Sequence, residues 1–317
     1  IDRHGDDLFT HQTAYARDML QRFGLDKANT ASTPMPPGFV FLANSGEPSA
    51  DHRLFRELLG ALRWLTLTRV DLCFAVNALC RYLANPNDAH VAAAKHVCRY
   101  VLGTLDTGLW YRHGDGTILM EAYSDADLAG DLTHYKSTAG YIIRLNSTSA
   151  PVSFASKIQH DVATSTCHAE YIALYETARE VVHMRGVLED LLPAAHLPLP
   201  PTRVFGDNEG SIALCKNPIH SKRNKHFPIK LHYTRQLRAT GIIDVLKVHT
   251  SLMWADSLTK PFAPKQLREH TAILTGSPTG TPAALLGTLQ LAETWSPADS
   301  DKDSARPRCT CRKSSVT

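Results

Sequence analysis

Hydrophobic residues in the first third of the chain recur at the spacing of α-helices. The segment AYARDMLQRFGL gathers its apolar side chains on one helical face and ends at Gly24, a residue type that commonly terminates helices. A link rich in Pro and Gly follows, and turn residues then separate three helix-length segments: FRELLGALRWLTLT, DLCFAVNALCRYLAN and DAHVAAAKHVCRYVLGTL. The pattern predicts a mostly helical region from Thr13 to about Tyr111.

The period of the pattern changes between Thr117 and about Phe262. Three strand-like runs come in close succession, as in an antiparallel meander: ILMEAYSD, GYIIRLN and PVSFASK. A long helix follows from Thr164, with N-capping residues at its start, and two later strands, TRVFGD and IIDVLKV, alternate with helical segments. Strands first, and then alternating helices and strands, favour an α/β fold in which helices flank a mixed five-stranded sheet.

The last part of the chain, from about residue 263, lacks a hydrophobic period. GSPTGTP and SPADSDKDSARPR have compositions typical of disordered segments. Between them, AALLGTLQLAETW is long enough for one short helix. We expect residues 263–317 to form a low-complexity, disordered tail.

Composition narrows the class of protein without indicating a partner. The 317 residues, 43% apolar and 21% charged, are typical of a soluble globular protein, and 34 Lys and Arg stand against 31 Asp and Glu. Seven scattered cysteines indicate reduced thiols, so we expect an intracellular protein, either cytoplasmic or nuclear. No apolar run could span a bilayer and no signal peptide is recognisable, so we expect no membrane partner. Because the first residue is Ile1 and not Met, we expect a fragment or a piece of a polyprotein.

Four acidic residues stand where the predicted elements begin or end. Asp125 ends the first strand of the mixed sheet and Asp207 ends the fourth, so both carboxylates would emerge at one sheet edge if these strands are parallel neighbours. Glu170 lies in the first turns of the long helix, and Asp256 opens the last helical segment. Carboxylates crowded against a core need a cation, and oxygen ligands of this kind favour Mg²⁺.

A series of motifs lies between Ile118 and about Phe262: YSDADLAGD, KSTAGYI, VSFASK, HAEYIAL, GDNEGSIALCKNP, KHFPIKLHYTR and ADSLTKP. In order and rough spacing, these motifs resemble the ribonuclease H domain of copia-type LTR retrotransposons. Upstream, LLGALRWLTLTRVDLCFAVNALCRYLANP and HVAAAKHVCRYVLGTLDTGLWY resemble the helical region after the palm of the same element's reverse transcriptase. The resemblance implies a palm and thumb remnant in residues 1–112, a ribonuclease H-like domain in residues 117–262, and the tail.

The resemblance also implies a site and a reaction. The family's four acids fall on Asp125, Glu170, Asp207 and Asp256, all of which are present. They would hold two Mg²⁺ ions, with Mn²⁺ as an alternative, for two-metal endonucleolytic hydrolysis of the RNA strand of an RNA–DNA hybrid. The implied partners are the hybrid, the nucleic-acid backbone and the polymerase part of the same polyprotein, whose aspartates would lie upstream of Ile1.

Several positions depart from the residues that are usual in this family. Tyr135 replaces a basic residue, Cys167 and His168 replace a Thr-Glu pair, Glu209 replaces a Gln, and Ser251-Leu252-Met253-Trp254 replaces a polar run. None of these changes removes a predicted metal ligand, but they indicate drift in a transposon copy. The alternative function is therefore a catalytically inactive, nucleic-acid-binding remnant of the polyprotein.

The distribution of charge supports a nucleic-acid partner independently of the resemblance. No Asp or Glu occurs from Ser211 to Ile243, whereas basic residues alternate there with histidine and aromatic residues. This composition is typical of a surface that follows phosphates and stacks bases, with an ordinary solvated helix face as the alternative. The candidate nucleic-acid-binding residues are Lys136, Asn208, Lys216, Lys222, Arg223, Lys225, Lys230 and Arg235.

The sequence gives little support for polymerase, ATP-binding, integrase or zinc-binding functions. Gly5-Asp6-Asp7 resembles the paired aspartates of a polymerase palm, but it lacks the preceding aromatic residue and the flanking apolar strands, so we interpret it as a surface turn. We interpret Asp127 and Asp131 as solvated or locally hydrogen-bonded acids. An ATP-binding or integrase-type function lacks support, because there is no Gly-rich phosphate loop and the three-acid spacing of integrases is not matched. The 16 histidines show no zinc-binding spacing with cysteines.

Overall fold

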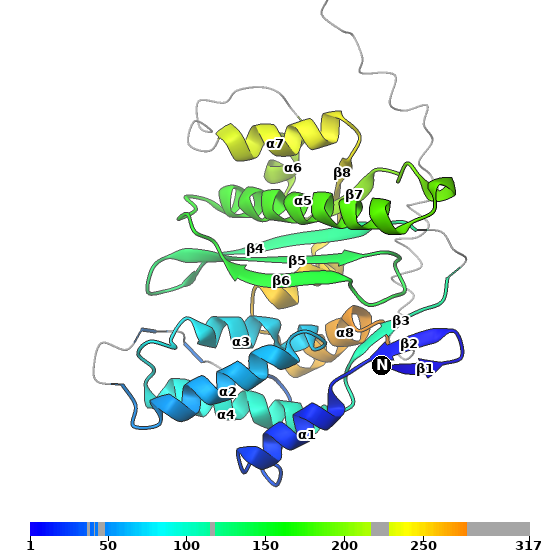
Figure 1. Cartoon of the computed structure of the whole chain (residues 1–317). Coiled ribbons are helices and arrows are strands. Elements are labelled where there is room, and N and C mark those ends of the chain that lie inside the picture. Colours follow the sequence, from blue (N-terminus) through cyan, green and yellow to red (C-terminus); the bar gives the residue numbers. More distant parts are fainter. Residues whose placement is uncertain (37–38, 41, 44–47, 115–117, 217–227, 278–317) are drawn as a thin grey trace, which may run out of the picture. The chain divides into compact units, whose positions relative to one another are not determined.

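In Figure 1 a five-stranded sheet, with three helices on one side of it, lies above a group of helices from the N-terminal part of the chain. The computed structural model describes residues 1–36, 39–40, 42–43, 48–114, 118–216 and 228–277, which belong to one compact unit. The expected α/β fold class, a mixed five-stranded sheet flanked by helices and preceded by a mostly helical region, is confirmed.

Four α-helices make up most of the N-terminal region. They are α1 (Thr13–Arg22), α2 (His52–Leu65), α3 (Cys73–Cys80) and α4 (Asp88–Gly103), and a short 3₁₀ helix, η1 (Val70–Leu72), precedes α3. Their apolar faces meet in one core, in which Leu58, Leu62 and Val97 are fully buried. Burying such a side chain contributes about 1.5–3 kcal/mol to stability, so this packing holds together helices that are individually short.

A small antiparallel sheet beside these helices was not predicted. Its strands are β1 (Asp2–His4), β2 (Asp7–Thr10) and β3 (Leu109–Tyr111), in the order β1-β2-β3. The turn between β1 and β2 contains Gly5, whose φ of +65° favours glycine. Gly5 and Asp6 thus form a surface turn, as expected, but Asp7 begins β2, and its Oδ2 pairs with Arg112 Nη1 at 2.6 Å.

The larger sheet has the strand order β6-β5-β4-β7-β8. Its strands are β4 (Glu121–Asp131), β5 (Lys136–Arg144), β6 (Ser153–Ile158), β7 (Thr202–Gly206) and β8 (Ile243–Lys247). β4, β5 and β6 form the expected antiparallel meander, whereas β7 and β8 extend the sheet in parallel from β4. The predicted mixed topology is confirmed.

Helices α5 (Thr166–Leu191), α6 (Glu209–Lys216) and α7 (Pro228–Ala239) cover one face of this sheet (Figure 1). Ser165 caps α5 by accepting a hydrogen bond from the backbone N–H of His168, within the predicted capping segment. Tyr171 and Leu174 of α5 pack in one core with Ile143 and Val204 of the sheet. This core fixes the long helix across the strands.

Residues after β8 return to the opposite face of the sheet. The 3₁₀ helix η5 (Trp254–Leu258) packs there so closely that a Cβ on Gly140 would lie 2.9 Å from the Leu258 Cβ. Helix α8 (Pro264–Leu274) then places Leu267 in the core of the N-terminal helices. None of the described helices is both long and apolar enough to cross a membrane.

Helix α8 corrects the expected start of the disordered tail at residue 263. Leu267, His270, Ile273 and Leu274 are buried, and they follow one another at intervals of one helical turn or less. This pattern covers only two to three turns between a Pro-rich and a Gly-rich segment, so it does not stand out in the sequence. Residues 278–317 lie outside the described part of the chain.

Candidate active site

The parallel pairing of β4 and β7 brings two of the predicted acids together. The last paired residues of this ladder are Tyr123 and Phe205. Asp125 and Asp207 each follow two residues later, so they occupy matching positions beyond the end of the ladder. The expectation that these strands are parallel neighbours is confirmed.

Asp125 does not end its strand, contrary to the sequence-based expectation. β4 continues to Asp131, because it remains paired with β5 after its ladder with β7 has ended. The Asp125 side chain therefore projects from the middle of a strand that is fixed on one side, and it is 4% exposed. Such a position holds a carboxylate more rigidly than a loop would.

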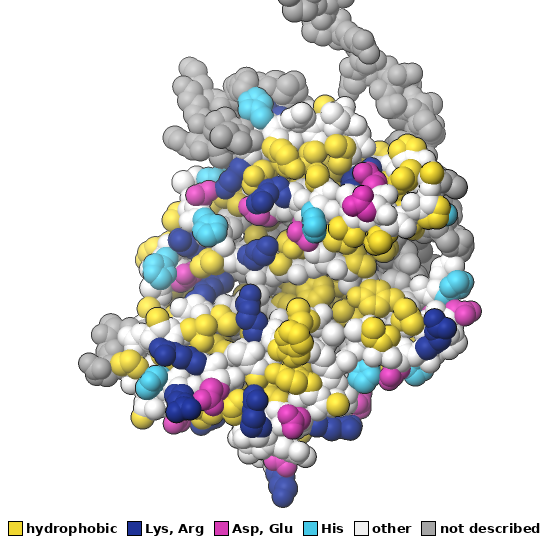
Figure 2. Space-filling model, viewed as in Figure 1, with side chains coloured by type: hydrophobic (Ala, Val, Ile, Leu, Met, Phe, Trp, Pro, Cys, Tyr) yellow, Lys and Arg dark blue, Asp and Glu magenta, His cyan; other side chains and the backbone are white. Residues whose placement is uncertain are grey.

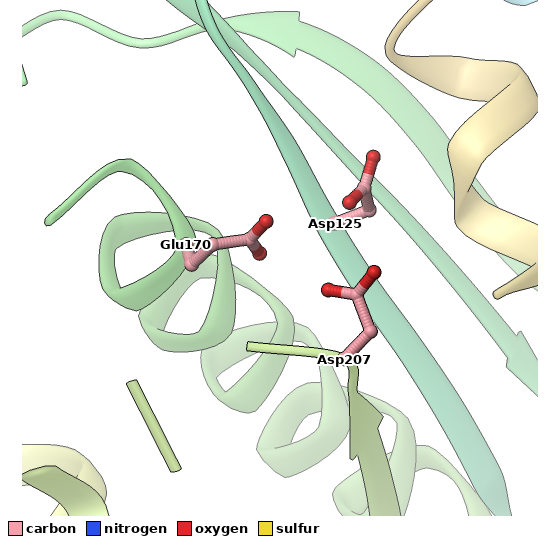
Figure 3. A group of neighbouring side chains, drawn as sticks. All are labelled: Asp125, Glu170 and Asp207. Carbon is pink, nitrogen blue, oxygen red and sulfur yellow. The ribbon is translucent and has the colours of Figure 1, made fainter. Parts of the chain in front are cut away.

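Glu170 reaches the same place from the first turns of α5. The helix approaches the sheet closely here because the contact consists of alanines: Ala126, Ala139, Ala163, Ala169 and Ala173. Carboxylate oxygens of Asp125, Glu170 and Asp207 all lie within 4.8 Å of one another. Figure 3 shows the three side chains pointing toward a common centre from β4, from α5 and from the residue after β7.

Burial and mutual repulsion make this group of acids costly to ionise. Burial raises the pKa of Glu170 to about 10, and the charges of Asp125 and Asp207 add to the shift. Burial also raises the pKa of Asp125 to about 7, with a further contribution from the charge of Asp256. A cation placed among these carboxylates would remove most of the repulsion.

The fourth predicted acid, Asp256, lies next to Asp125 but outside the group of three. It is buried in η5, where its Oδ2 accepts a hydrogen bond of 2.9 Å from Nζ of Lys260. Its Oδ1 is buried and has no hydrogen-bond partner in the described structure. One oxygen of this carboxylate is thus neutralised by a lysine. The other is a buried, unsatisfied acceptor that a hydrogen-bond donor or a cation would stabilise.

Three polar residues around the acids were missed from the sequence. The hydroxyl of Thr259 donates to Asp125 Oδ2, Lys260 binds Asp256, and the hydroxyl of Thr250 donates to Asp207 Oδ2 at 3.0 Å. Lys260 could have been found, because an acid and a lysine four residues apart face each other on one helical turn. No local pattern indicates the partners of Thr259 and Thr250, because these contacts join distant segments.

The donor atoms of the acid group fit a hard divalent cation. Asp125, Glu170 and Asp207 offer only oxygen, two of the three side chains are buried, and their oxygens are close enough to share an ion. Mg²⁺ prefers oxygen ligands and few protein carboxylates, whereas zinc sites favour nitrogen and sulfur. The unpartnered Oδ1 of Asp256 provides a further acceptor beside the group.

Five of the eight predicted nucleic-acid-binding residues lie in the described part of the chain. Lys222, Arg223 and Lys225 lie outside the described residues. Asn208 caps α6 through its side-chain oxygen, Arg235 donates to the Leu214 carbonyl, and Lys230 pairs with Asp161 at 2.6 Å. Lys216 is exposed at the end of α6, and Lys136 is partly exposed at the start of β5.

The two acids expected to stand outside the site, Asp127 and Asp131, differ in their surroundings. Asp131 is buried and accepts hydrogen bonds from the Thr133 backbone and from His134. Asp127 is partly buried, which raises its pKa, while the charges of Lys260 and Arg81 oppose that shift. Neither belongs to the group of three acids whose oxygens could share an ion.

No family model matches the chain. The chain is 37% identical over 257 residues to the retrovirus-related Pol polyprotein from transposon RE2 of Arabidopsis thaliana, covering 81% of this chain and 17% of that protein. It is 32% identical over 261 residues to the retrovirus-related Pol polyprotein from transposon TNT 1-94 of Nicotiana tabacum, covering 80% of this chain and 19% of that protein.

Among solved structures, the chain is similar to LC11-RNase H1 in complex with an RNA/DNA hybrid, with 14% identity and a TM-score of 0.33 over 44% of this chain and 93% of that chain. The sequence relatives are far longer than this chain, which spans only 17% and 19% of their lengths. Their identity to it nevertheless extends over both the helical region and the mixed sheet. The homologues of this chain are thus retrovirus-related Pol polyproteins of copia-type transposons, to which it is similar over about four-fifths of its own length.

Proposed function

We propose that this chain is a ribonuclease H-type endonuclease that hydrolyses the RNA strand of RNA–DNA hybrids with Mg²⁺. The observation that supports it most directly is the convergence of Asp125, Glu170 and Asp207 within 4.8 Å from three separate elements. Similarity to the Pol polyproteins of retrotransposons adds to this support, since retrotransposons copy RNA into DNA and the resulting hybrid must lose its RNA strand. Residues 117–262 would form the nuclease domain, and residues 1–112 a polymerase remnant without polymerase chemistry.

Each acid has a role that its position allows. Asp125, fixed in mid-strand, would hold the Mg²⁺ ions together with Glu170 and Asp207. Asp256 would be the fourth, outer ligand, through its unpartnered Oδ1. When bound, the two ions would lower the pKa of the attacking water and stabilise the charge on the leaving 3′ oxygen.

The chain's own residues supply position and charge. The Thr259 hydroxyl holds one oxygen of Asp125, which leaves the other oxygen to face Glu170 and Asp207. Because three acids converge, with Asp256 beside them, the site repels a phosphodiester unless cations are present, so hydrolysis should depend strictly on the metal. The candidate basic residues from Lys216 to Arg235 would hold the hybrid's phosphates.

One assay tests the proposal. The purified chain is incubated with an end-labelled RNA–DNA hybrid, with Mg²⁺ or with EDTA, beside the Asp125→Asn variant. The proposal requires Mg²⁺-dependent internal cleavage of the RNA strand that EDTA and the substitution both abolish. If the unmodified chain binds the hybrid but never cleaves it, the chain is the inactive nucleic-acid-binding remnant instead.

A further inference from the structure

Three acids lie on the side of the sheet that η5 covers. Asp125 is the cross-strand partner of Gly140, and a Cβ on Gly140 would lie 2.9 Å from the Leu258 Cβ of η5. Because cross-strand partners project from the same face of a sheet, the Asp125 side chain points toward η5, and so does that of Asp127, two residues later. η5 itself carries Asp256, which lies next to Asp125. We call Asp125, Asp127 and Asp256 the η5-side acids.

The η5-side acids share one lysine. Nζ of Lys260 donates to Oδ2 of Asp256 at 2.9 Å. Burial disfavours a charged lysine, but the hydrogen bond to Asp256 and the charges of the three acids outweigh it and raise the pKa of Lys260. Arg81 adds a second positive charge near Asp127. On the face of the molecule in Figure 2, acidic side chains are scattered among basic ones, so three acids that share one lysine are a local feature of this site.

The group of Asp125, Glu170 and Asp207 contains no lysine of this kind. The charges that raise the pKa of Glu170 are those of Asp125, Asp207 and Asp256. Within the described part of the chain, no basic side chain forms an ion pair with any member of this group. The two clusters therefore meet at Asp125, and the protein supplies its own cation to the η5-side acids alone.

An ammonium group and a divalent ion compete for the carboxylate of Asp256. Mg²⁺ binds carboxylate oxygens at about 2.0–2.1 Å, and those oxygens are also the acceptors for a lysine N–H. An ion on Oδ1 of Asp256 would share one carboxylate with the ammonium of Lys260 on Oδ2, and like charges at that distance repel each other. A second divalent ion at the η5-side acids therefore requires Lys260 to move.

We propose that Lys260 takes the place of a second divalent ion at the η5-side acids while the protein is free of substrate. One divalent ion then binds first, at the group of three acids, and a second ion binds only after Lys260 has released Asp256. The inference rests on the proposed function and adds an order of ion binding to it. A lysine that merely satisfies a buried acid four residues away would not set the number of ions bound.

The test counts the Mn²⁺ ions bound by the substrate-free chain, from the electron paramagnetic resonance signal of free Mn²⁺ during a titration. In the unmodified chain the second ion should bind more weakly than the first by about tenfold or more. Lys260→Met should lower the Kd of the second ion by about tenfold or more, because the competing charge is gone. Lys260→Arg should leave it unchanged. Lys265→Met is the matched control, because Lys265 is exposed on α8.

Two further variants locate the additional ion and protect the test against misfolding. Asp256→Asn in the Lys260→Met chain should remove the gained ion and leave the first ion bound. Lys260→Gln loses the charge but keeps an N–H donor for Asp256. It replaces the Met variant in the titration if circular dichroism shows that the Met variant is unfolded at the assay temperature.

The inference and the proposed function can fail separately. Two ions of similar affinity in the unmodified chain overturn the inference, and so does a second ion whose Kd is the same without the lysine charge. A gain that survives Asp256→Asn, or that Lys265→Met also produces, overturns it too. If the ions bind in the proposed order but the hybrid is never cleaved, only the proposed function fails. If the hybrid is cleaved and Lys260 has no effect on ion binding, only the inference fails.

Discussion

The side-chain hydroxyl of Thr259 donates a 2.5 Å hydrogen bond to Oδ2 of Asp125, a residue 134 positions earlier in the chain. Both side chains are buried. The bond lowers the pKa of Asp125 and so opposes the effect of burial and of Asp256. Thr259 thus keeps the central acid oriented and closer to its ionised form, although it contacts neither the substrate nor an ion.

Thr259→Val should weaken the site without disrupting the fold. Valine has the same shape, but it leaves Asp125 without its donor, and hydrogen bonds to charged groups contribute about 1.5–3 kcal/mol. We expect weaker Mg²⁺ binding by calorimetry and a hydrolysis rate about tenfold lower. Thr259→Ser, which keeps the hydroxyl, should retain both. Equal behaviour of the Val and Ser variants would show that the hydrogen bond has no such role.

Lys260→Met should make the protein more dependent on Mg²⁺ for stability. The substitution removes the cation that neutralises Asp256, whose other oxygen already lacks a partner. In EDTA the melting temperature should fall, and added Mg²⁺ should raise it more than in the unmodified chain. Lys260→Arg should behave like the unmodified chain. A Met variant with the same response to Mg²⁺ would mean that Asp256 takes no part in ion binding.

Asp125→Asn should lower the rate of hydrolysis by several orders of magnitude and leave affinity for the hybrid intact. The loss is confined to the rate because the bound ions act mainly in the transition state. Stability should hold or rise, since one of four repelling acids is removed. Asp127→Asn is the matched control, because Asp127 is only partly buried and stands outside the group of three acids. If Asp127→Asn abolished hydrolysis and Asp125→Asn did not, the assignment of the site would be wrong.

Without metal, the protein should become less stable as the pH rises. The pKa of Asp125 is raised from its ordinary 3.8 to about 7 and that of Glu170 from 4.5 to about 10, so the folded state holds these protons more tightly. Their stabilising contribution is complete below about pH 4 and disappears as the pH passes each raised value. Melting temperatures in EDTA should therefore fall between pH 5 and 8, and Mg²⁺ should reverse the fall at pH 8. A melting temperature in EDTA that does not change with pH would contradict the raised pKa values of Asp125 and Glu170.

A chain truncated after Phe262 should be unstable, although it retains every predicted catalytic residue. It would lack α8, which places Leu267 in the N-terminal core and accepts a hydrogen bond from Arg144 at the Ile273 carbonyl. Losing one such buried leucine costs about 2–5 kcal/mol, before the other contacts are counted. A urea-unfolding midpoint equal to that of residues 1–277 would refute this.

The structural features that follow from a repeating sequence pattern could be predicted from the sequence. Periods of two and of three to four residues predicted the five strands of the large sheet and the helices around it, and the order of these elements predicted the mixed topology. The acids at Asp125 and Asp207 were placed correctly relative to each other, because matching positions after parallel strands meet at one edge.

Features that depend on single contacts between distant segments could not be predicted. β1, β2 and β3 have three or four residues each, too few to show a period. β4 extends beyond Asp125 because of its partner strand, which local composition does not reveal. The position of Asp256 outside the group of the other three acids results from how η5 packs on the sheet, whereas its pairing with Lys260, four residues later, is local.

The place of Leu267 also bears on how the chain folds as it is synthesised. Its neighbours in the N-terminal core come from residues 16–101, so roughly 165 residues must be made before the last member of that core exists. At ~5–20 residues per second, the core would stay incomplete on the ribosome for roughly 10–30 s. During that interval the mixed sheet is translated, so the first region to emerge would be among the last to reach full stability.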